Sequence, residues 1–246
     1  MTRTGGRENI VLLLTGTIHV YDKHYTILTD PLQRKQHYVT TIKYYLEKYP
    51  FPIVFVENSN ENLSYFFTDE IKSGRLEVLT FDGNHYPPEF GKGLGELKCI
   101  GYAVEHATSF TDDSFIFKIT GRYQVINLQD FIVTYEKHPS LELLADLTNN
   151  FRFSSSAIVG FKRFFIKKYL LKNASLLNDK EGFYFEHALA KAVLEAIGDH
   201  VDFKIFKHYP RLRAISGTTG KPYKKSFLYM LPRRFKYWLR YYVLMR

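Results

Sequence analysis

The chain has 246 residues, of which 45% are hydrophobic and 17% aromatic, so it can bury the core of one large folded domain and is not a disordered protein. Its single cysteine, Cys99, excludes an internal disulfide and any Cys-Xaa-Xaa-Cys metal or redox motif, which favours a reducing cytoplasm. The apolar run at residues 10–14 is too short for a signal sequence or a membrane span.

The positive charge is concentrated near the C-terminal end. The formal net charge is +9, and residues 203–246 contain twelve Lys or Arg and no Asp or Glu, which leaves the first 202 residues at about −3. Because the basic residues are not spread over the whole chain, general nucleic-acid binding is not expected.

The first elements predict a parallel sheet. Residues 9–14 form a continuous apolar run, typical of a buried strand, that ends in Thr15-Gly16-Thr17. A helix is expected over residues 32–48, after Pro31, and a second strand over residues 51–56, ending at Glu57. The alternation of strand, helix and strand favours an α/β fold.

Two further strands end in polar turns. We expect a helix over residues 63–71, a strand over 76–81 and a strand over 114–119. The last strand leads into a turn that carries Lys118, Thr120, Arg122 and Tyr123. Parallel strands share a direction, so these turns meet at one edge, where α/β sheets bind ligands. The cations make that edge a candidate floor for an anionic ligand, although a plain polar turn with a surface arginine would look the same.

A glycine-rich stretch precedes the next predicted helix. Gly91-Lys92-Gly93-Leu94-Gly95-Glu96 leads into a helix expected over residues 96–106. Free N–H groups and the helix dipole favour phosphate at such a position, and glycine allows close approach. The spacing matches neither the dinucleotide fingerprint nor the Walker loop, and glycines that only end a loop are the alternative.

The second half contains candidate ligand-facing segments. We expect a helix over residues 127–135, a strand or short helix over 141–147, a strand over 152–160 and an amphipathic helix over 161–171. The run Ser154-Ser155-Ser156 would either face a ligand or be ordinary strand polarity. A helix over 181–196 carries Glu186 and His187 in its first turns. Residues 209–221 form a loop with Arg213 and Lys221 that would close over a ligand or link to the tail.

The C-terminal tail, residues 224–246, interleaves aromatic residues with arginine and lysine. It is too charged to span a bilayer but suits the membrane interface, with aromatic rings at headgroup depth and cations toward anionic lipid. A helix packed on the domain with its arginines outward is the alternative. Aromatic residues among cations also occur in proteins that bind single-stranded nucleic acid.

The order of these elements resembles bacterial GT-A-fold glycosyltransferases that build capsular polysaccharide and lipopolysaccharide O-antigen. The likeness rests on Thr-Gly-Thr, Glu-Asn-Ser-Asn, Lys-Gly-Xaa-Gly-Glu and Lys-Ile-Thr-Gly-Arg-Tyr in that order, and covers residues 9–223 in layout. It implies a Rossmann-like, mostly parallel sheet flanked by helices in residues 1–223, with a donor half at about 9–127, an acceptor half at about 128–223 and a C-terminal basic amphipathic helix. It also implies a nucleotide-sugar donor, usually a UDP-hexose, and a lipid-linked glycan acceptor.

The resemblance also implies roles for single residues. Thr15, Gly16 and Thr17 would lie near the nucleotide, with Glu57 meeting the uridine. Lys92, Gly93 and Glu96 would lie near the phosphates and sugar of the donor. In inverting members a carboxylate at the start of a later helix deprotonates the acceptor hydroxyl, and here Glu186 stands at that place. The usual Glu-Asp is Glu186-His187 in this chain, so His187 would share or replace the role, and a retaining mechanism stays open.

One motif of the family is missing. GT-A enzymes hold a divalent cation with Asp-Xaa-Asp, and no two aspartates stand two apart in this sequence. We expect cations to neutralise the leaving diphosphate instead, with Lys118, Arg122, Arg213 and Lys221 as candidates and Thr120 beside them. Metal-independence is therefore favoured, with manganese and magnesium left open.

The sequence as a whole predicts a hexosyltransferase attached to the inner face of the cell membrane. A single-stranded nucleic-acid-binding protein that uses the basic aromatic tail is one alternative. A sugar-nucleotide nucleotidyltransferase is another, although it should carry a metal-binding carboxylate pair that the sequence does not display.

Overall fold

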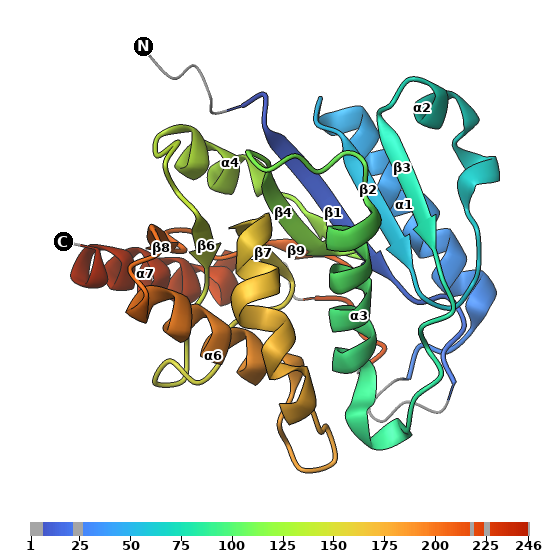
Figure 1. The fold of residues 1–246 in the computed structure, drawn as a ribbon. Coiled ribbons are helices and arrows are strands. Elements are labelled where there is room, and N and C mark those ends of the chain that lie inside the picture. The colour runs from blue at the N-terminus through green and yellow to red at the C-terminus, as the bar shows by residue number, and fades with distance from the viewer. Residues whose placement is uncertain (1–6, 22–26, 217–218, 224–226, 246) are drawn as a thin grey trace.

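A computed structural model describes residues 7–21, 27–216, 219–223 and 227–245 (Figure 1). Its centre is a seven-stranded sheet of order β3-β2-β1-β4-β7-β6-β8. The strands are β1 (Ile10–Gly16), β2 (Ile53–Glu57), β3 (Leu76–Thr80), β4 (Phe115–Thr120), β6 (Leu143–Ala145), β7 (Ile158–Lys162) and β8 (Phe203–Ile205). Only β7 runs against its neighbours in this sheet. The predicted mostly parallel sheet is thus confirmed, and residues 141–147 contain a strand rather than a helix.

Helices cover both faces of the sheet. In Figure 1, α3 (Gly91–His106) and α6 (Phe185–Gly198) lie in front of it and α1 (Pro31–Lys48) lies behind. Alternate residues of β1 enter two separate cores: Val11 and Leu13 pack with α3 and α6, whereas Ile10, Leu12 and Leu14 pack with α1 and α4 (Leu128–Glu136). Burial on both faces explains why this strand reads as a continuous apolar run. The fold is therefore a three-layer α/β/α arrangement.

Smaller elements complete the chain. They are η1 (Ser64–Phe66), α2 (Thr68–Lys72), η2 (Pro88–Phe90), the continuous helical segment α5 (Arg163–Phe165), η3 (Ile166–Leu170) and η4 (Leu171–Leu176), and α7 (Phe227–Leu244). A separate antiparallel ribbon pairs β5 (Gln124–Val125) with β9 (Leu212–Arg213). The ribbon brings the segment after β4 beside the loop that was predicted over residues 209–221.

Helix α1 begins where the sequence predicts. The side chain of Asp30 accepts a hydrogen bond from the Leu32 N–H at 3.0 Å, and Pro31 occupies the first helical position. Tyr38, Ile42 and Tyr45 are buried on its inner face. Arg34 lies on the same face, which places a cation at the carboxyl edge of the sheet.

The glycine-rich stretch is helix, not loop. The prediction of a helix over 96–106 was too short, because α3 starts at Gly91. A Cβ atom on Gly91 would lie 1.8 Å from a carboxylate oxygen of Asp179, and one on Gly93 would lie 2.8 Å from Cβ of Phe185 in α6. Glycine is needed here so that α3 can pack closely on the segment before α6 and on its first residue.

The helix expected over residues 63–71 and the strand expected over residues 152–160 have different bounds in the structure. The helix expected over 63–71 is interrupted at Phe67, whose φ of −140° turns the chain so that both Leu63 and Phe67 are buried. The strand expected over 152–160 is observed at Ile158–Lys162. Before it, Asn149 and its two successors adopt left-handed backbone angles, and an isolated bridge pairs Thr148 with Phe153 across that turn.

The helix expected over 181–196 also starts later, at Phe185. Gly182 has a φ of +80°, and an isolated bridge pairs Asn178 with Phe183, so the chain makes a tight turn before the helix. The start of α6 is fixed by His187, whose Nδ1 accepts a hydrogen bond from the Tyr184 N–H at 3.1 Å.

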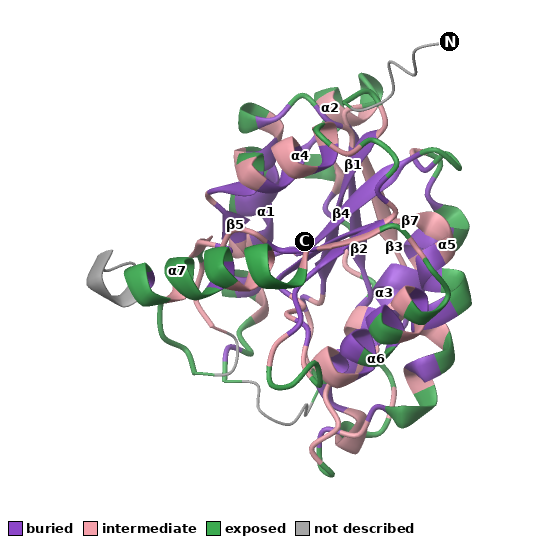
Figure 2. Cartoon of the chain, turned by 90° about the vertical axis from the view of Figure 1, so that its left-hand side faces the viewer, coloured by how far each residue is buried: buried purple, intermediate pink, exposed green. Residues whose placement is uncertain are grey.

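The C-terminal helix α7 is docked on the domain through one face. Tyr237 is 7% exposed, and its hydroxyl donates to Asp146, which is 2% exposed. The Arg240 guanidinium also pairs with Asp146 at 2.5 Å. The other face of α7 is solvent-exposed (Figure 2). Within the described residues, none of the helices combines the length and hydrophobicity needed to cross a membrane.

Candidate functional site

Two adjoining cavities lie at the carboxyl ends of β1 and β4. The smaller has a volume of about 90 Å³ and the larger about 320 Å³, and both are lined by Lys92, Glu96, Thr120 and Arg122. The smaller is otherwise lined by Thr15, Gly16, Thr17, Val20, Arg34, Tyr38, Asn84, Tyr86 and Cys99. The four shared residues join the cavities into one cleft at the edge that the sequence predicts.

Arg34 is held firmly in the smaller cavity. Its Nε donates to the Thr17 carbonyl oxygen at 2.7 Å, and its Nη1 donates to the Leu28 carbonyl oxygen at 2.9 Å. The Tyr38 hydroxyl donates to the same Thr17 carbonyl at 3.1 Å. Burial is the main cause of a lowered pKa for Arg34, with the nearby Arg122 acting in the same direction. No ion pair in the described part of the chain neutralises Arg34.

Arg122 brings a second cation to the same place. The turn that carries it is fixed by Gly121, whose N–H donates to the Thr15 carbonyl at 2.9 Å and whose missing Cβ allows this approach. Nη1 of Arg122 reaches the Ile215 carbonyl at 3.3 Å, while its buried Nε has no hydrogen-bond partner in the described chain. A buried donor without a partner is costly, so this arginine is suited to an added acceptor.

Glu96 lies at the junction of the two cavities. Its Oε1 accepts hydrogen bonds from Lys118 Nζ, from the Thr120 hydroxyl at 3.0 Å and from the Thr15 hydroxyl at 3.4 Å. Lys118 has no exposed side-chain surface, whereas the Glu96 side chain is 18% exposed. The structure thus places Lys118 beneath the cleft, where it holds Glu96, and not where its charge would meet a ligand directly.

Glu57 binds the backbone that follows β1 and β2 and does not line the cleft. It is completely buried, and its carboxylate accepts hydrogen bonds from the N–H groups of Ile18 at 2.8 Å, Ser59 at 2.9 Å and Glu61 at 2.9 Å. Burial raises the pKa of this carboxyl, and the hydrogen bonds oppose that rise. The uridine contact that the resemblance implies for Glu57 is not available to a side chain so enclosed.

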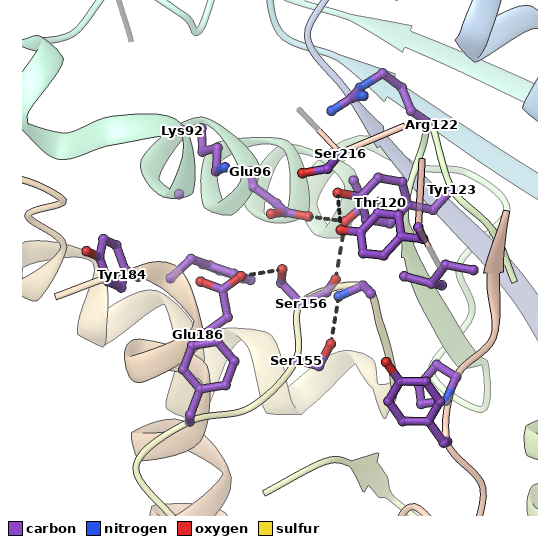
Figure 3. Close-up of a pocket in the computed structure, with 18 of the residues that line it drawn as sticks. Lys92, Glu96, Thr120, Arg122, Tyr123, Ser155, Ser156, Tyr184, Glu186 and Ser216 are labelled. Atoms are coloured by element: carbon purple, nitrogen blue, oxygen red, sulfur yellow. Dashed lines mark hydrogen bonds between the residues drawn. The ribbon is translucent and has the colours of Figure 1, made fainter. Parts of the chain in front are cut away.

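The larger cavity joins α3 to α6. Figure 3 shows the carboxylates of Glu96 and Glu186 turned toward the same cavity, one from each helix. The Ser156 hydroxyl donates to Glu186 Oε1 at 2.7 Å, and the Ser156 carbonyl accepts from Lys118 Nζ at 2.6 Å. A hydrogen-bonded chain therefore runs from Glu186 through Ser156 and Lys118 to Glu96.

Aromatic side chains form the outer wall of the larger cavity. They include Tyr123, Tyr184, Tyr209, Tyr223 and Tyr237, next to Ser155, Ser156 and Ser216. Burial is the main cause of a raised pKa for Tyr123, whose hydroxyl accepts from the Tyr223 hydroxyl at 3.1 Å. A wall of neutral rings and hydroxyls beside a carboxylate suits a polyhydroxylated ligand such as a sugar.

Besides Glu57 and Lys118, three further predicted site residues line neither cavity. His187 caps α6 and packs against the rings of Phe153, Phe183 and Tyr184, so its Nδ1 is already used. Arg213 is exposed on β9 and borders a separate depression beside His37, and Lys221 is exposed farther along the same loop. None of these three side chains lines a cavity with Glu96, although Arg213 shares the depression beside His37 with Arg122. Residues 217–218 of the predicted lid loop lie outside the described residues.

The N-terminus of α3 is already occupied by the protein. Asp179 is 3% exposed, and its carboxylate lies against Gly91, the first residue of the helix. A carboxylate at that position interacts favourably with the helix dipole and repels a second anion. Asp179 thus disfavours phosphate at these backbone N–H groups, and Lys92 and Gly93 of the same segment line the larger cavity.

Arg34 was not predicted as a site residue, and Ser156 was predicted only as one member of a serine run. Arg34 and Tyr38 are four residues apart, so the spacing alone puts this arginine on the apolar stripe of α1, and that was the available signal. Ser156 was noticed only within a serine run that also read as ordinary polarity. Among the described residues, no group of three or more His, Cys, Asp or Glu is gathered so that it could hold a metal ion.

Comparisons with known proteins give similarity of fold only. No protein-family model matches the sequence, and no curated protein is detectably similar to it. A protein described as a nucleotide-diphospho-sugar transferase from Desulfovibrio desulfuricans is 8% identical, with a TM-score of 0.47 over 95% of this chain and 98% of that one. A glycosyltransferase involved in glycosylation of the major capsid of PBCV-1 is 10% identical, with a TM-score of 0.43 over 80% and 81%. The inositol-1-phosphate CTP transferase from T. maritima is 13% identical, with a TM-score of 0.44 over 94% and 98%. Similarities this distant assign no function to the chain.

Proposed function

We propose that the protein is a glycosyltransferase that moves a hexose from a UDP-linked donor to a lipid-linked glycan in surface-polysaccharide assembly. The observation that carries the proposal is the two-part cleft: a small cavity with Arg34 and Arg122 continues into a larger one with Glu186, Ser156 and a tyrosine wall. A nucleotide diphosphate suits the first part and a sugar acceptor the second.

In this mechanism the cations act on the leaving group. As the bond from the anomeric carbon to the diphosphate breaks, negative charge grows on the phosphate oxygens. Arg34 and Arg122 lie where they would stabilise that charge, with Lys92 at the boundary of the two cavities. Glu96 lies at the same boundary and is suited to accept hydrogen bonds from hydroxyls of the transferred sugar.

Glu186 is the proposed base. Its carboxylate faces the larger cavity and accepts a hydrogen bond from Ser156, which orients it. Taking the proton of the acceptor hydroxyl during attack on the anomeric carbon would give inversion at that carbon. The proposed donor half at residues 9–127 is supported by the smaller cavity, whose described lining falls within residues 15–122. The larger cavity takes its lining from the donor half, from the proposed acceptor half at 128–223 and from Tyr237.

A nucleotidyltransferase is the second candidate. The cation pair of the smaller cavity would also suit a nucleoside triphosphate, since Arg34 and Arg122 meet phosphate oxygens without regard to the group beyond them. The two reactions differ in what they release. A glycosyltransferase frees a nucleoside diphosphate, whereas a nucleotidyltransferase frees pyrophosphate.

The test is a product assay. The protein is incubated with UDP-hexoses and a lipid extract as acceptor source, and separately with CTP or UTP and sugar phosphates. Release of UDP that Glu186→Gln abolishes supports the proposal. Release of pyrophosphate without UDP would assign the second candidate instead. A chain that binds and turns over no nucleotide, yet binds single-stranded nucleic acid through the C-terminal helix, would overturn both.

A further inference from the structure

A third cavity lies against α7, outside the cleft. Its volume is about 370 Å³, and its walls come from α7, from the start of α4 and from residues 207–211. The side chains that give it chemical character are Lys207, Arg211, Arg234, Phe235, Trp238 and Asp130. It is thus a basic and aromatic hollow on the side of the domain where the C-terminal helix is docked.

The charges around this cavity favour an anion. Three of the lining side chains are cations and one, Asp130, is a carboxylate. Asp130 accepts a hydrogen bond from Asn127 Nδ2 at 3.0 Å, and no ion pair in the described part of the chain involves Arg211 or Arg234. The pKa of His208 is lowered, mainly by burial, so its ring adds little positive charge to the cavity. Three cations and one carboxylate leave two positive charges in excess, and the two guanidinium groups match the oxygens of a phosphate group.

The rim of the cavity is apolar and faces outward. Leu231 is 48% exposed, Phe235 61% and Trp238 46%, although such residues are usually buried. They lie on the face of α7 opposite to Tyr237, which packs into the domain. Leu239, Tyr242 and Val243 continue the exposed face toward the end of the helix. In Figure 2, much of the ribbon of α7 is coloured as exposed. A ligand that fits has a phosphate head and a hydrocarbon environment beside it.

The cavity is next to the larger cavity of the cleft. Tyr209 lines both, and its neighbours alternate, with Pro210 facing the larger cavity and Arg211 facing the third one. The chain segment that carries Tyr209 is therefore the shared wall. A membrane that reached α7 would lie close to the place proposed for the acceptor sugar.

We propose that this cavity binds the phosphate head of an anionic membrane lipid, with the exposed face of α7 in the bilayer interface. Only the reason for membrane binding rests on the proposed function: it would bring the acceptor cavity to the membrane, where a lipid-linked glycan is found. The lipid contact itself depends on Arg211, Arg234 and the aromatic rim. Aromatic rings at headgroup depth beside cations are typical of interfacial helices.

Trp238 makes the proposal directly measurable, because it is the single tryptophan of the chain and it lines the cavity. The full-length protein is titrated with phosphatidylcholine vesicles that contain phosphatidylglycerol, and binding is read from the tryptophan emission and from flotation. We expect a blue shift and flotation with these vesicles and neither with pure phosphatidylcholine. Binding to both vesicle types alike would overturn a site for an anionic head.

Matched variants separate the cavity from general surface charge. Arg211→Ala with Arg234→Ala is expected to weaken vesicle binding about thirtyfold, which corresponds to about 1 kcal/mol for each basic residue at an anionic surface. The control, Lys72→Ala with Lys191→Ala, removes the same charge from exposed positions on α2 and α6 and should change binding little. Equal losses in the two double variants would overturn the proposal.

A second comparison stays on α7. Arg234 and Lys236 are both exposed on this helix, but only Arg234 lines the cavity. Arg234→Ala should therefore weaken vesicle binding more than Lys236→Ala, and an equal loss would contradict a defined site. A single-stranded oligonucleotide that produced the same emission shift and displaced vesicles would assign the surface to nucleic acid and overturn the lipid.

Vesicle binding and UDP binding can be tested independently of each other. UDP binding by the Arg211→Ala and Arg234→Ala double variant is expected to equal that of the parent protein, because neither residue lines the cleft. Lost vesicle binding with retained UDP binding therefore supports the lipid site. If the parent protein binds vesicles but no nucleotide, the glycosyltransferase proposal fails while the lipid site stands.

Discussion

The two cavities of the cleft are built differently. In the smaller one, Arg34, Tyr38 and Thr17 hold one another through hydrogen bonds on well-packed helix and strand ends. In the larger one, Glu186 is oriented by Ser156, and much of the wall comes from loops such as residues 154–157 and 209–216. Side chains held on helix and strand ends suit the part of a ligand that is the same in every reaction. Side chains on loops suit the part that differs between ligands. The contrast fits a constant nucleotide diphosphate and a variable acceptor.

The largest expected effect is on chemistry in the larger cavity. Glu186→Gln keeps the shape and the Ser156 contact but removes the basic oxygen, so transfer should fall by about 10² to 10⁴-fold. UDP affinity should be unchanged, because Glu186 does not line the smaller cavity. Glu181→Gln, an exposed neighbour before α6, is the control. A loss of UDP binding in Glu186→Gln would contradict the assignment of nucleotide binding to the smaller cavity and proton transfer to the larger one.

The next effect is on stability at the boundary of the cavities. Lys118→Met removes a fully buried cation from Glu96, and breaking such a pair costs about 3 kcal/mol in the free energy of unfolding. Urea denaturation measures it, with the exposed Lys137→Met as control. Adding Glu96→Gln should recover part of the loss, since the carboxylate no longer needs its partner. No recovery would show that packing, not charge, sets the cost.

A smaller effect is expected from Arg34→Ala in the smaller cavity. A hydrogen bond to a charged group contributes about 1.5 to 3 kcal/mol, so UDP affinity should drop roughly tenfold or more. Lys43→Ala, an exposed cation on the same helix, should leave the affinity unchanged. Calorimetry on both variants makes the comparison. If Arg34→Ala bound UDP as well as the parent protein, its hydrogen bonds to Thr17 and Leu28 would be purely structural.

The smallest effect concerns pH. The pKa of His37 is lowered from 6.5, mainly by burial and further by Arg122 and Arg34, so the imidazole is neutral at pH 7. A bound diphosphate adds negative charge near the two arginines and favours the protonated ring. UDP affinity should therefore rise as the pH falls below 6.5, by a few-fold. His37→Gln should flatten this difference, and subtraction of the two profiles removes the titration of UDP itself. Identical profiles would contradict the linkage.

The sequence predicted the framework well because its signals were local. Continuous apolar runs indicated the central strands, and Pro31 indicated the start of α1. Thr15, Thr120 and Arg122 were placed at one edge by strand direction alone, and they do line the same cavity. Such inferences need only the direction of a strand and the place where it ends.

The surroundings of several predicted site residues depend on contacts that the sequence pattern does not show, some between distant segments and some with nearby backbone. The sequence around Lys118 does not predict its ion pair with Glu96. The sequence around Gly91 does not predict that Asp179 packs against the start of α3. Glu57 and His187 looked available for a ligand until their hydrogen bonds to nearby backbone N–H groups were visible. Burial and pairing of polar groups are tertiary properties, and a residue pattern does not encode them directly.

The most direct test of the account is calorimetric titration of UDP, in EDTA and with manganese, into the parent protein, Arg122→Ala and Arg213→Ala. The sequence grouped these two arginines, but only Arg122 lines the smaller cavity. The account predicts that UDP binds in EDTA, that Arg122→Ala weakens binding roughly tenfold or more, and that Arg213→Ala changes it little. If UDP does not bind in either condition, or if the two variants lose affinity equally, the smaller cavity is not a diphosphate site.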